Sequence, residues 1–201
     1  MKDWTKIPPA APGQRIGILG GTFNPAHDGH RHISLMALRR LRLQNIWWMV
    51  TPGNPLKDND DLPPLEARAT FAEAMANHPA ISVTGLEAGI KTRFTFDTLA
   101  TLRERLPAVR FVWVMGSDNL AQFHRWQGWR EITELMPLAV VNRPGSSLAT
   151  RSSVAAQTLW RSRVHETQAG MLASMSAPAW TFLHGPKSHL SSTAIREATG
   201  K

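Results

Sequence analysis

The sequence predicts a single α/β domain built on a doubly wound parallel sheet with helices on both faces. Two short apolar segments, residues 16–19 and 45–51, flank an amphipathic segment, and this strand–helix–strand order is typical of a parallel sheet. A later apolar run, residues 110–115, ends in Gly-Ser-Asp, the kind of strand exit at which open α/β sheets bind ligands. With 201 residues and 42% hydrophobic content, the chain can bury one substantial core.

The expected elements follow one another along the chain. Residues 1–14 are rich in proline and glycine and predict a loose lead-in to a domain that covers residues 15–201. Apolar residues at helical spacing, with arginines on the other side, predict an amphipathic helix over residues 31–42. Residues 53–64 are polar and predict a loop, while the weakly patterned residues 146–177 predict a surface excursion or a mobile segment. The other expected elements are helices over residues 65–77, 94–106 and from Thr193 onward, and strands over residues 81–84, 138–141 and 179–183.

The first strand leads into a glycine-rich turn and two histidines. Gly20 and Gly21 allow the backbone to approach a ligand closely. A helix that begins near Asp28 would place His27 and His30 on neighbouring positions of its first turn. The backbone N–H groups at such a start have no partner inside the helix and favour an anion. The stretch therefore predicts a phosphate site with two imidazoles attached.

Two other interpretations of the histidines remain open. A pair at this spacing can bind zinc, although a third ligand is needed and His32 would point off that face of the helix. His27 could instead serve only as a helix cap inside the core. The small polar groups of Thr22 and Asn24, close to the glycines, favour phosphate binding.

A second candidate anion site lies near the end of the chain. Ser192 and Thr193 are typical helix-start residues, whose hydroxyls and backbone amides can hold phosphate oxygens. Arg196 lies three residues after Thr193, on the same helical face. Its charged guanidinium can donate a pair of hydrogen bonds to phosphate oxygens. The alternative is an ordinary capped helix with a solvated arginine. One of these two anion sites could hold the phosphates next to the nucleoside, and the other could hold the pyrophosphate end of the nucleotide.

Composition excludes several classes of protein. The absence of cysteine rules out disulfides and thiolate metal sites. No apolar run approaches the ~20 residues that span a bilayer, so we expect no membrane partner and a soluble, cytoplasmic protein. The net charge of +8 raises nucleic acid as a partner. No basic run interleaved with aromatics occurs, however, and small phosphorylated ligands explain the charge about as well, so no nucleic-acid partner is expected.

Two motifs carry a resemblance to a known family. Residues 20–30, Gly-Gly-Thr-Phe-Asn-Pro-Ala-His-Asp-Gly-His, resemble the signature of the nucleotidylyltransferase superfamily with its H-x-G-H motif, and residues 191–196, Ser-Ser-Thr-Ala-Ile-Arg, resemble its second signature. Over residues 16–196 the chain looks most like the bacterial nicotinate-nucleotide adenylyltransferases. This resemblance implies a Rossmann-like fold and transfer of the adenylyl group of ATP to nicotinate mononucleotide, which gives deamido-NAD and pyrophosphate in NAD biosynthesis.

The middle of the chain carries the family's substrate positions. Thr95 matches the position that contacts the nicotinate ring, and Trp126 matches the tryptophan that stacks on it. The segment that starts at Gly116 resembles the ribose-binding loop, which implies that Asp118 contacts a ribose. The alternatives are a helix cap for Thr95 and a core position for each tryptophan, and for Trp129 we expect the core.

The chain departs from the family pattern in places. Leu56 stands where many members have a histidine, although Asn54 and Lys57 beside it still fit positions that meet the mononucleotide and phosphate. Ser117 replaces the usual alanine of the ribose loop, which is a small change. Arg143 matches a family position that is expected to contact nicotinate mononucleotide, with a surface turn as the alternative.

The resemblance also implies a division of catalytic roles. His27 and His30 would stabilise the α-phosphate and its bridging oxygen, and Arg196 would stabilise the leaving phosphates. Magnesium would bridge phosphate oxygens with few protein ligands, and no metal site of the protein itself is expected. The expected ATP- and phosphate-binding residues are Gly20, Gly21, Thr22, Phe23, Lys57, Gly116, Asp118, Ser192 and Thr193.

Rival functions remain open on the sequence alone. The acceptor could be nicotinamide mononucleotide or phosphopantetheine, as in other adenylyltransferases of the superfamily. A basic nucleic-acid-binding module and an inactive nucleotide sensor are the rivals outside enzyme catalysis. The sequence also leaves open whether the chain forms a homo-oligomer.

Overall fold

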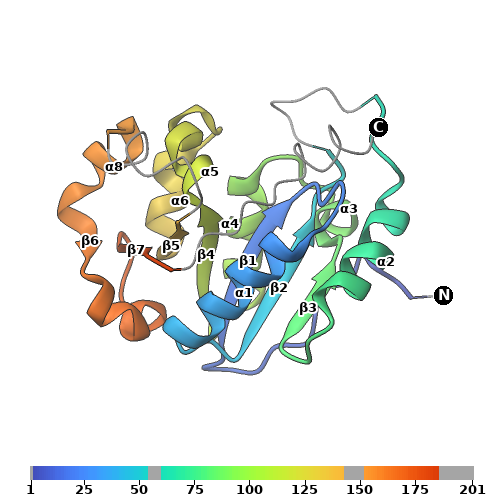
Figure 1. Cartoon of the computed structure of the whole chain (residues 1–201), viewed down its shortest axis with the longest axis horizontal. Helices are drawn as coiled ribbons and strands as arrows, with labels where there is room; N and C mark the ends of the chain where they lie inside the picture. The colour runs from blue at the N-terminus through green and yellow to red at the C-terminus, as the bar shows by residue number, and fades with distance from the viewer. Residues whose placement is uncertain (1, 54–59, 143–151, 186–201) are drawn as a thin grey trace.

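The computed structural model describes residues 2–53, 60–142 and 152–185, and seven strands in these residues form one sheet (Figure 1). The strands are β1 Arg15–Gly21, β2 Asn45–Val50, β3 Ile81–Thr84, β4 Arg110–Gly116, β5 Leu138–Val141, β6 Arg163–Val164 and β7 Trp180–Leu183. Their order across the sheet is β3-β2-β1-β4-β5-β7-β6, and each neighbouring pair is parallel. The predicted parallel α/β sheet is therefore confirmed.

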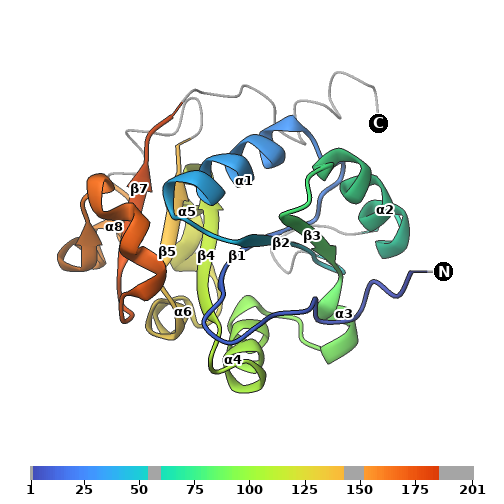
Figure 2. The same ribbon diagram turned by 90° about the horizontal axis from the view of Figure 1, so that it is seen from below.

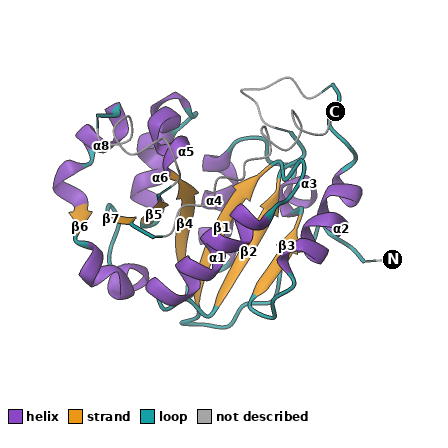
Figure 3. Ribbon diagram, in the orientation of Figure 1, coloured by secondary structure: helices purple, strands orange, loops and turns teal. Residues whose placement is uncertain are grey.

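Helices cover both faces of this sheet, as the sequence predicts (Figure 3). The α-helices are α1 Asp28–Arg40, α2 Leu65–Ala76, α3 Leu86–Ile90, α4 Thr95–Arg105, α5 Ser117–Gln122, α6 Trp129–Leu135 and α8 Val154–Thr158, and the 3₁₀ helices are η1 Phe123–Arg125, η2 Trp160–Ser162 and η3 Glu166–Ser174. Figure 2 shows α1 and α2 on one side of the sheet and α3, α4 and α6 on the other. None of the described helices is long and apolar enough to cross a membrane.

The central strands are apolar on both faces because both faces are buried. Side chains alternate along a strand, so Ile18 of β1 and Trp113 of β4 face the layer of α4 and α6, whereas Leu19 and Val114 face the layer of α1 and α2. This explains why the strand segments read as continuous apolar runs rather than as an alternation of apolar and polar residues.

Most predicted boundaries agree with the structure. The strands over residues 81–84 and 138–141 have the predicted bounds. The helix predicted over residues 31–42 begins earlier, at Asp28, because His27 caps it. Strand β6 was missed because it has only two residues and depends on its pairing with β7. The helix predicted from Thr193 onward lies outside the described residues.

Residues 2–14 are not the loose lead-in that their composition predicted. The Trp4 side chain is buried, and its carbonyl accepts hydrogen bonds from the Gly85 N–H at 2.7 Å and the Thr84 hydroxyl at 3.2 Å. Further along, the Gly13 N–H donates to the Ala108 carbonyl at 2.7 Å. Proline and glycine here prevent regular structure, while one aromatic side chain and the backbone bonds hold the segment against β3 and the turn before β4.

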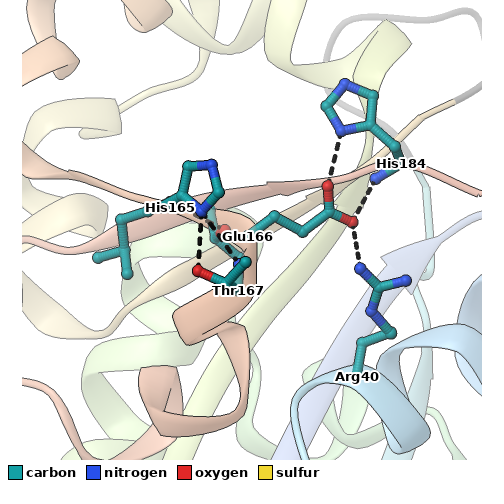
Figure 4. A network of polar contacts seen from close by, with 7 residues as sticks. Arg40, His165, Glu166, Thr167 and His184 are labelled. Atoms are coloured by element: carbon teal, nitrogen blue, oxygen red, sulfur yellow. Dashed lines mark hydrogen bonds and ion pairs between the residues drawn. The ribbon is translucent and has the colours of Figure 1, made fainter.

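The predicted excursion is packed where it is described. Residues 152–177 contain α8, η2, β6 and η3, with buried side chains such as Leu172. Glu166 ties this segment to the rest of the sheet: its carboxylate accepts from Arg40 Nη2 at 2.5 Å, from the His184 N–H at 2.9 Å and from His184 Nδ1 at 2.8 Å (Figure 4). The excursion leaves the sheet after β5 and returns to its edge through β6 and β7.

Candidate active site

Strand order places the candidate site at one edge of the sheet. In register, Gly21 at the end of β1 pairs with Val50 of β2, and Gly116 at the end of β4 pairs with Val141 of β5, so these strands end together. The chain passes from β1 to β2 on one side, while β4 lies on the other side of β1. Open α/β sheets bind ligands at such a reversal of strand order. The turn after β1 and the start of α5 both follow strands that end at this edge.

The start of α1 is held by a reciprocal pair of histidine bonds. His27 is the N-cap, and its Nδ1 accepts from the Gly29 N–H at 3.0 Å. The His27 N–H in turn donates to Nδ1 of His30 at 3.3 Å. The His27 side chain is only 3% exposed. His27 therefore caps α1, which leaves open whether it serves only as a cap, and the same bonds orient both rings.

These bonds indicate which nitrogen of each ring carries the proton. A neutral imidazole has one donor and one acceptor nitrogen, so a ring whose Nδ1 accepts carries its proton on Nε2. His27 and His30 are therefore Nε2–H donors, with ring centroids 3.9 Å apart. A protonated Nε2 does not coordinate a metal, and the described residues contain no group of three or more His, Cys, Asp or Glu side chains that could hold one. The arrangement suits an anion.

The His30 ring packs against two aromatic side chains. Its ring lies 4.6 Å from Phe23 and 6.0 Å from Trp48, and Phe23 stacks on Trp48 at 5.1 Å. Trp48 Nε1 donates to the Ser34 hydroxyl at 2.7 Å, which donates to the His30 carbonyl at 2.9 Å. Phe23 has a φ of +47°, a strained value for a residue with a side chain. The buried stack holds it in that conformation.

The two glycines of the turn serve different purposes. A Cβ on Gly20 would lie 2.5 Å from Cη2 of Trp113, so a side chain there would collide with the core. A Cβ on Gly21 would come no closer than 3.6 Å to Phe23. Close approach of a ligand therefore remains the explanation for Gly21, whereas Gly20 is required by the packing of Trp113.

The predicted ring-binding residues lie on neighbouring segments. Thr95 is the first residue of α4, and because the N-cap is Phe94, the alternative that Thr95 is a helix cap is wrong. A Cβ on Gly128 would lie 3.0 Å from Cβ of Phe96, so the start of α4 packs against the segment that carries Trp126. Trp126 is half-buried, whereas Trp129 is buried, which confirms its expected core position.

Trp126 is held by two edge contacts with other rings. Its centroid lies 5.3 Å from that of Phe123 and 6.2 Å from that of Trp113. Since Trp113 also lies against Gly20, it connects the segment of Trp126 to the turn after β1. Asp118, the predicted ribose contact, is exposed on α5 directly after β4.

Sequence reasoning missed two buried charged residues near this edge. Arg68 of α2 is 4% exposed, and burial lowers the pKa of its guanidinium. Glu87 at the start of α3 is 3% exposed and accepts from the Thr98 hydroxyl at 3.1 Å. Burial raises the pKa of Glu87, and hydrogen bonds from Thr51 and Thr98 partly oppose the shift. A signal for Arg68 was its spacing from Ala72 and Ala76, which places it on the buried face of α2.

The structure places the described residues of the predicted site in two groups. Residues at the ends of β1 and β4 meet near the start of α1, and Thr95 and Trp126 lie on adjacent segments. Six predicted site residues lie outside the described part of the chain: Asn54, Lys57, Arg143, Ser192, Thr193 and Arg196.

Comparison with known proteins gives a consistent result. The model of the family described as cytidylyltransferase-like matches residues 18–198. A relative from Methylorubrum extorquens, named "Probable nicotinate-nucleotide adenylyltransferase", is 57% identical over 182 residues, which cover 90% of this chain and 98% of the relative. A relative of the same name from Brucella abortus is 55% identical over 182 residues, covering 90% and 94% of the two chains.

A solved structure supports the fold independently. The "Plasmodium falciparum nicotinic acid mononucleotide adenylyltransferase complexed with NaAD" superposes with a TM-score of 0.68 at 17% identity, over 92% of this chain and 83% of that chain. At this identity the likeness concerns the fold alone, whereas the family model and the relatives cover nearly the whole sequence. The chain therefore belongs to the cytidylyltransferase-like family, and within it to the nicotinate-nucleotide adenylyltransferases.

Proposed function

We propose that the protein transfers the adenylyl group of ATP to nicotinate mononucleotide, giving nicotinate adenine dinucleotide (deamido-NAD) and pyrophosphate. The observation that carries this proposal is the pair of imidazoles at the start of α1, His27 and His30, whose Nδ1 atoms both accept backbone N–H groups. The names of the relatives from Methylorubrum extorquens and Brucella abortus support the same activity. The product places the reaction in NAD biosynthesis.

The chemistry requires charge stabilisation rather than a strong base. An oxygen of the mononucleotide phosphate forms a bond to the α-phosphorus of ATP. The bond from that phosphorus to the oxygen bridging toward the β-phosphate breaks, and pyrophosphate leaves with the electron pair. A phosphate monoester has a second pKa of about 6, so the nucleophile is already largely ionised near neutral pH. Catalysis then depends on in-line positioning and on donors for the developing charge.

The proposed roles follow from this requirement. His27 and His30 would donate from Nε2 to the α-phosphate and its bridging oxygen, where negative charge increases as the bond breaks. Arg196, with Ser192 and Thr193, would hold the leaving phosphates, and Asp118 would contact a ribose. ATP would be used as its magnesium complex, since magnesium in such reactions is bound largely by substrate phosphates.

The acceptor would be recognised beside α4. We propose that Trp126 stacks on the pyridine ring, because it is a half-buried aromatic side chain that T-shaped contacts with Trp113 and Phe123 hold in place. Thr95, on the adjacent helix start, would contact the ring substituent.

One assay tests the proposal. Release of pyrophosphate from ATP and magnesium is measured with nicotinate mononucleotide, nicotinamide mononucleotide or phosphopantetheine offered in turn. We expect the largest kcat/KM with nicotinate mononucleotide. A larger value with either other acceptor would identify a different adenylyltransferase. ATP binding without release of pyrophosphate would indicate a nucleotide sensor, and salt-sensitive binding of a polynucleotide would favour a nucleic-acid-binding module.

A further inference from the structure

Arg68 is a buried cation whose described hydrogen bonds all go to backbone carbonyls. Its Nη1 donates to the carbonyl oxygens of Thr22 at 2.7 Å and Thr51 at 2.8 Å. Its Nη2 donates to Pro52 at 3.3 Å, and its Nε donates to Pro63 at 2.7 Å. Among the described residues no carboxylate forms an ion pair with it. Carbonyl dipoles from three segments therefore replace the water that the guanidinium loses.

The burial of this guanidinium depends on the carbonyls around it. Burial of a charge is unfavourable unless hydrogen bonds compensate for the lost hydration, and here the four bonds to carbonyls supply that compensation. The rest of this helix face consists of Ala69, Ala72 and Ala76, all buried, so Arg68 is the one charged side chain on this face of the described helix. A buried arginine at this position indicates that the placement of the carbonyls matters.

The carbonyls belong to the loops that leave two adjacent strands. Thr22 follows β1, while Thr51 and Pro52 follow β2, and the two loops are joined by a bond from the Thr51 N–H to the Gly21 carbonyl at 3.0 Å. Pro63 lies just before α2. One guanidinium thus fixes both loops at the carboxyl edge relative to each other and to the helix that carries it.

The same bonds fix the direction of two backbone amides. In a trans peptide the C=O and the following N–H point in opposite directions. Because the Thr22 carbonyl faces Arg68, the Phe23 N–H points away from it, and the Gly53 N–H points away likewise because the Pro52 carbonyl faces Arg68. Neither N–H donates to a residue in the described part of the chain. Phe23 also packs directly against His30.

We propose that Arg68 is a positioning residue that orients the backbone amides of Phe23 and Gly53 toward the phosphates of the bound nucleotide. The inference rests on the proposed adenylyl transfer, which supplies the anion that these amides would meet. Donors aimed in advance at developing charge are the most effective form of electrostatic catalysis, because they need not reorganise during the reaction.

The test compares the wild-type protein with Arg68→Lys and Arg68→Met. Lysine keeps the positive charge but lacks the planar fork that reaches several carbonyls at once. We expect kcat of both variants to fall about a hundredfold, as a misplacement of roughly 1 Å produces. Binding of α,β-methylene ATP, measured by calorimetry, should weaken as well. The KM for nicotinate mononucleotide should stay near its wild-type value, which a general loss of structure would not produce.

Arg15→Met is the matched control. Arg15 Nε also donates to a backbone carbonyl, that of Arg42 at 2.7 Å, but at the amino end of β1, so kcat should be unchanged. The kcat values and analogue affinities are measured below the melting temperature of each variant and are expressed per folded protein. If Arg68→Met does not fold, Arg68→Lys alone is compared with the wild type. Wild-type kcat and analogue affinity in Arg68→Lys would overturn the positioning role. An inactive wild-type protein would overturn the proposed function instead, and the analogue affinities would still test Arg68.

Discussion

The two sides of the candidate site are built by different interactions. On the phosphate side, which comprises residues 20–30 with Arg68, directional bonds to the backbone are added to the ring contacts of Phe23 and fix His27, His30 and the loops after β1 and β2. The ring side comprises the start of α4 and residues 123–129. Its contacts are apolar: the ring of Trp126 lies 5.3 Å from that of Phe123, and Gly128 packs against Phe96.

This difference indicates what each side does. Hydrogen bonds weaken steeply when their geometry changes, so a network of them holds donor atoms at fixed positions. Ring contacts are broader and hold a surface rather than an atom. We therefore expect the phosphate side to determine turnover and the ring side to determine acceptor affinity. Trp113 touches both sides, because it lies against Gly20 and against Trp126.

The largest effect is expected on the phosphate side, from His30→Ala. Loss of a preorganised donor to the α-phosphate should lower kcat roughly 10³-fold, as removal of an oxyanion donor does. The fold should remain intact, as measured by circular dichroism. His78→Ala is the control, because His78 Nδ1 accepts the Ala80 N–H at 3.1 Å before β3, away from the site. Normal turnover in His30→Ala would remove His30 from catalysis.

A smaller effect, of a different kind, is expected on the ring side. Trp126→Ala should raise the KM for nicotinate mononucleotide about tenfold, since aromatic pairs contribute roughly 0.5–1.5 kcal/mol beyond area burial. The KM for ATP should change less, and kcat should stay close to wild type. Steady-state kinetics with each substrate varied in turn measures this split. Trp160→Ala, at a tryptophan that is 65% exposed on η2, is the control. An effect confined to ATP would contradict the stacking role.

Gly20→Ala tests the connection between the two sides through Trp113. The new Cβ would lie 2.5 Å from Cη2 of Trp113, so we expect a loss of about 1–3 kcal/mol in the free energy of unfolding through overpacking. Trp113→Phe in the same chain should recover part of this loss. Gly21→Ala should cost much less stability, because its Cβ has room. Equal losses in chemical denaturation of the two alanine variants would refute the packing explanation for Gly20.

The smallest effect concerns Glu87, which lies between the two sides. Since burial raises its pKa in the folded protein, the folded state binds more protons than the unfolded chain between the ordinary and the raised pKa. The free energy of unfolding therefore falls as pH rises through this window, and Glu87→Gln abolishes that fall. Melting temperatures at several pH values should show wild type losing stability relative to Glu87→Gln as pH rises. A pH-independent difference would contradict the raised pKa.

Local patterns in the sequence predicted much of the fold. Strands such as residues 81–84 and 138–141 were found because short apolar runs ended at turn residues, and α1 was found from its amphipathic spacing, although its start was predicted at residue 31 rather than at Asp28. The edge where ligands would bind also followed, because parallel strands end together. These features depend on neighbours close in the sequence.

Features that depend on distant neighbours were not predictable. The requirement for Gly20 comes from Trp113, which lies on β4, and the order of residues 2–14 comes from Trp4 against β3. Arg68 reads as an ordinary helix arginine until Thr22 and Thr51 are placed beside it. In each case the physical cause is a contact between segments far apart along the chain.

The most direct test of the central claim is a competition between acceptors. ATP and magnesium are supplied with equal concentrations of nicotinate mononucleotide and nicotinamide mononucleotide, and the dinucleotides formed are separated by chromatography and identified by mass. The proposed function predicts that nicotinate adenine dinucleotide forms in excess and that His30→Ala forms little of either product. A predominance of NAD, or the absence of both dinucleotides with wild-type protein, would contradict it.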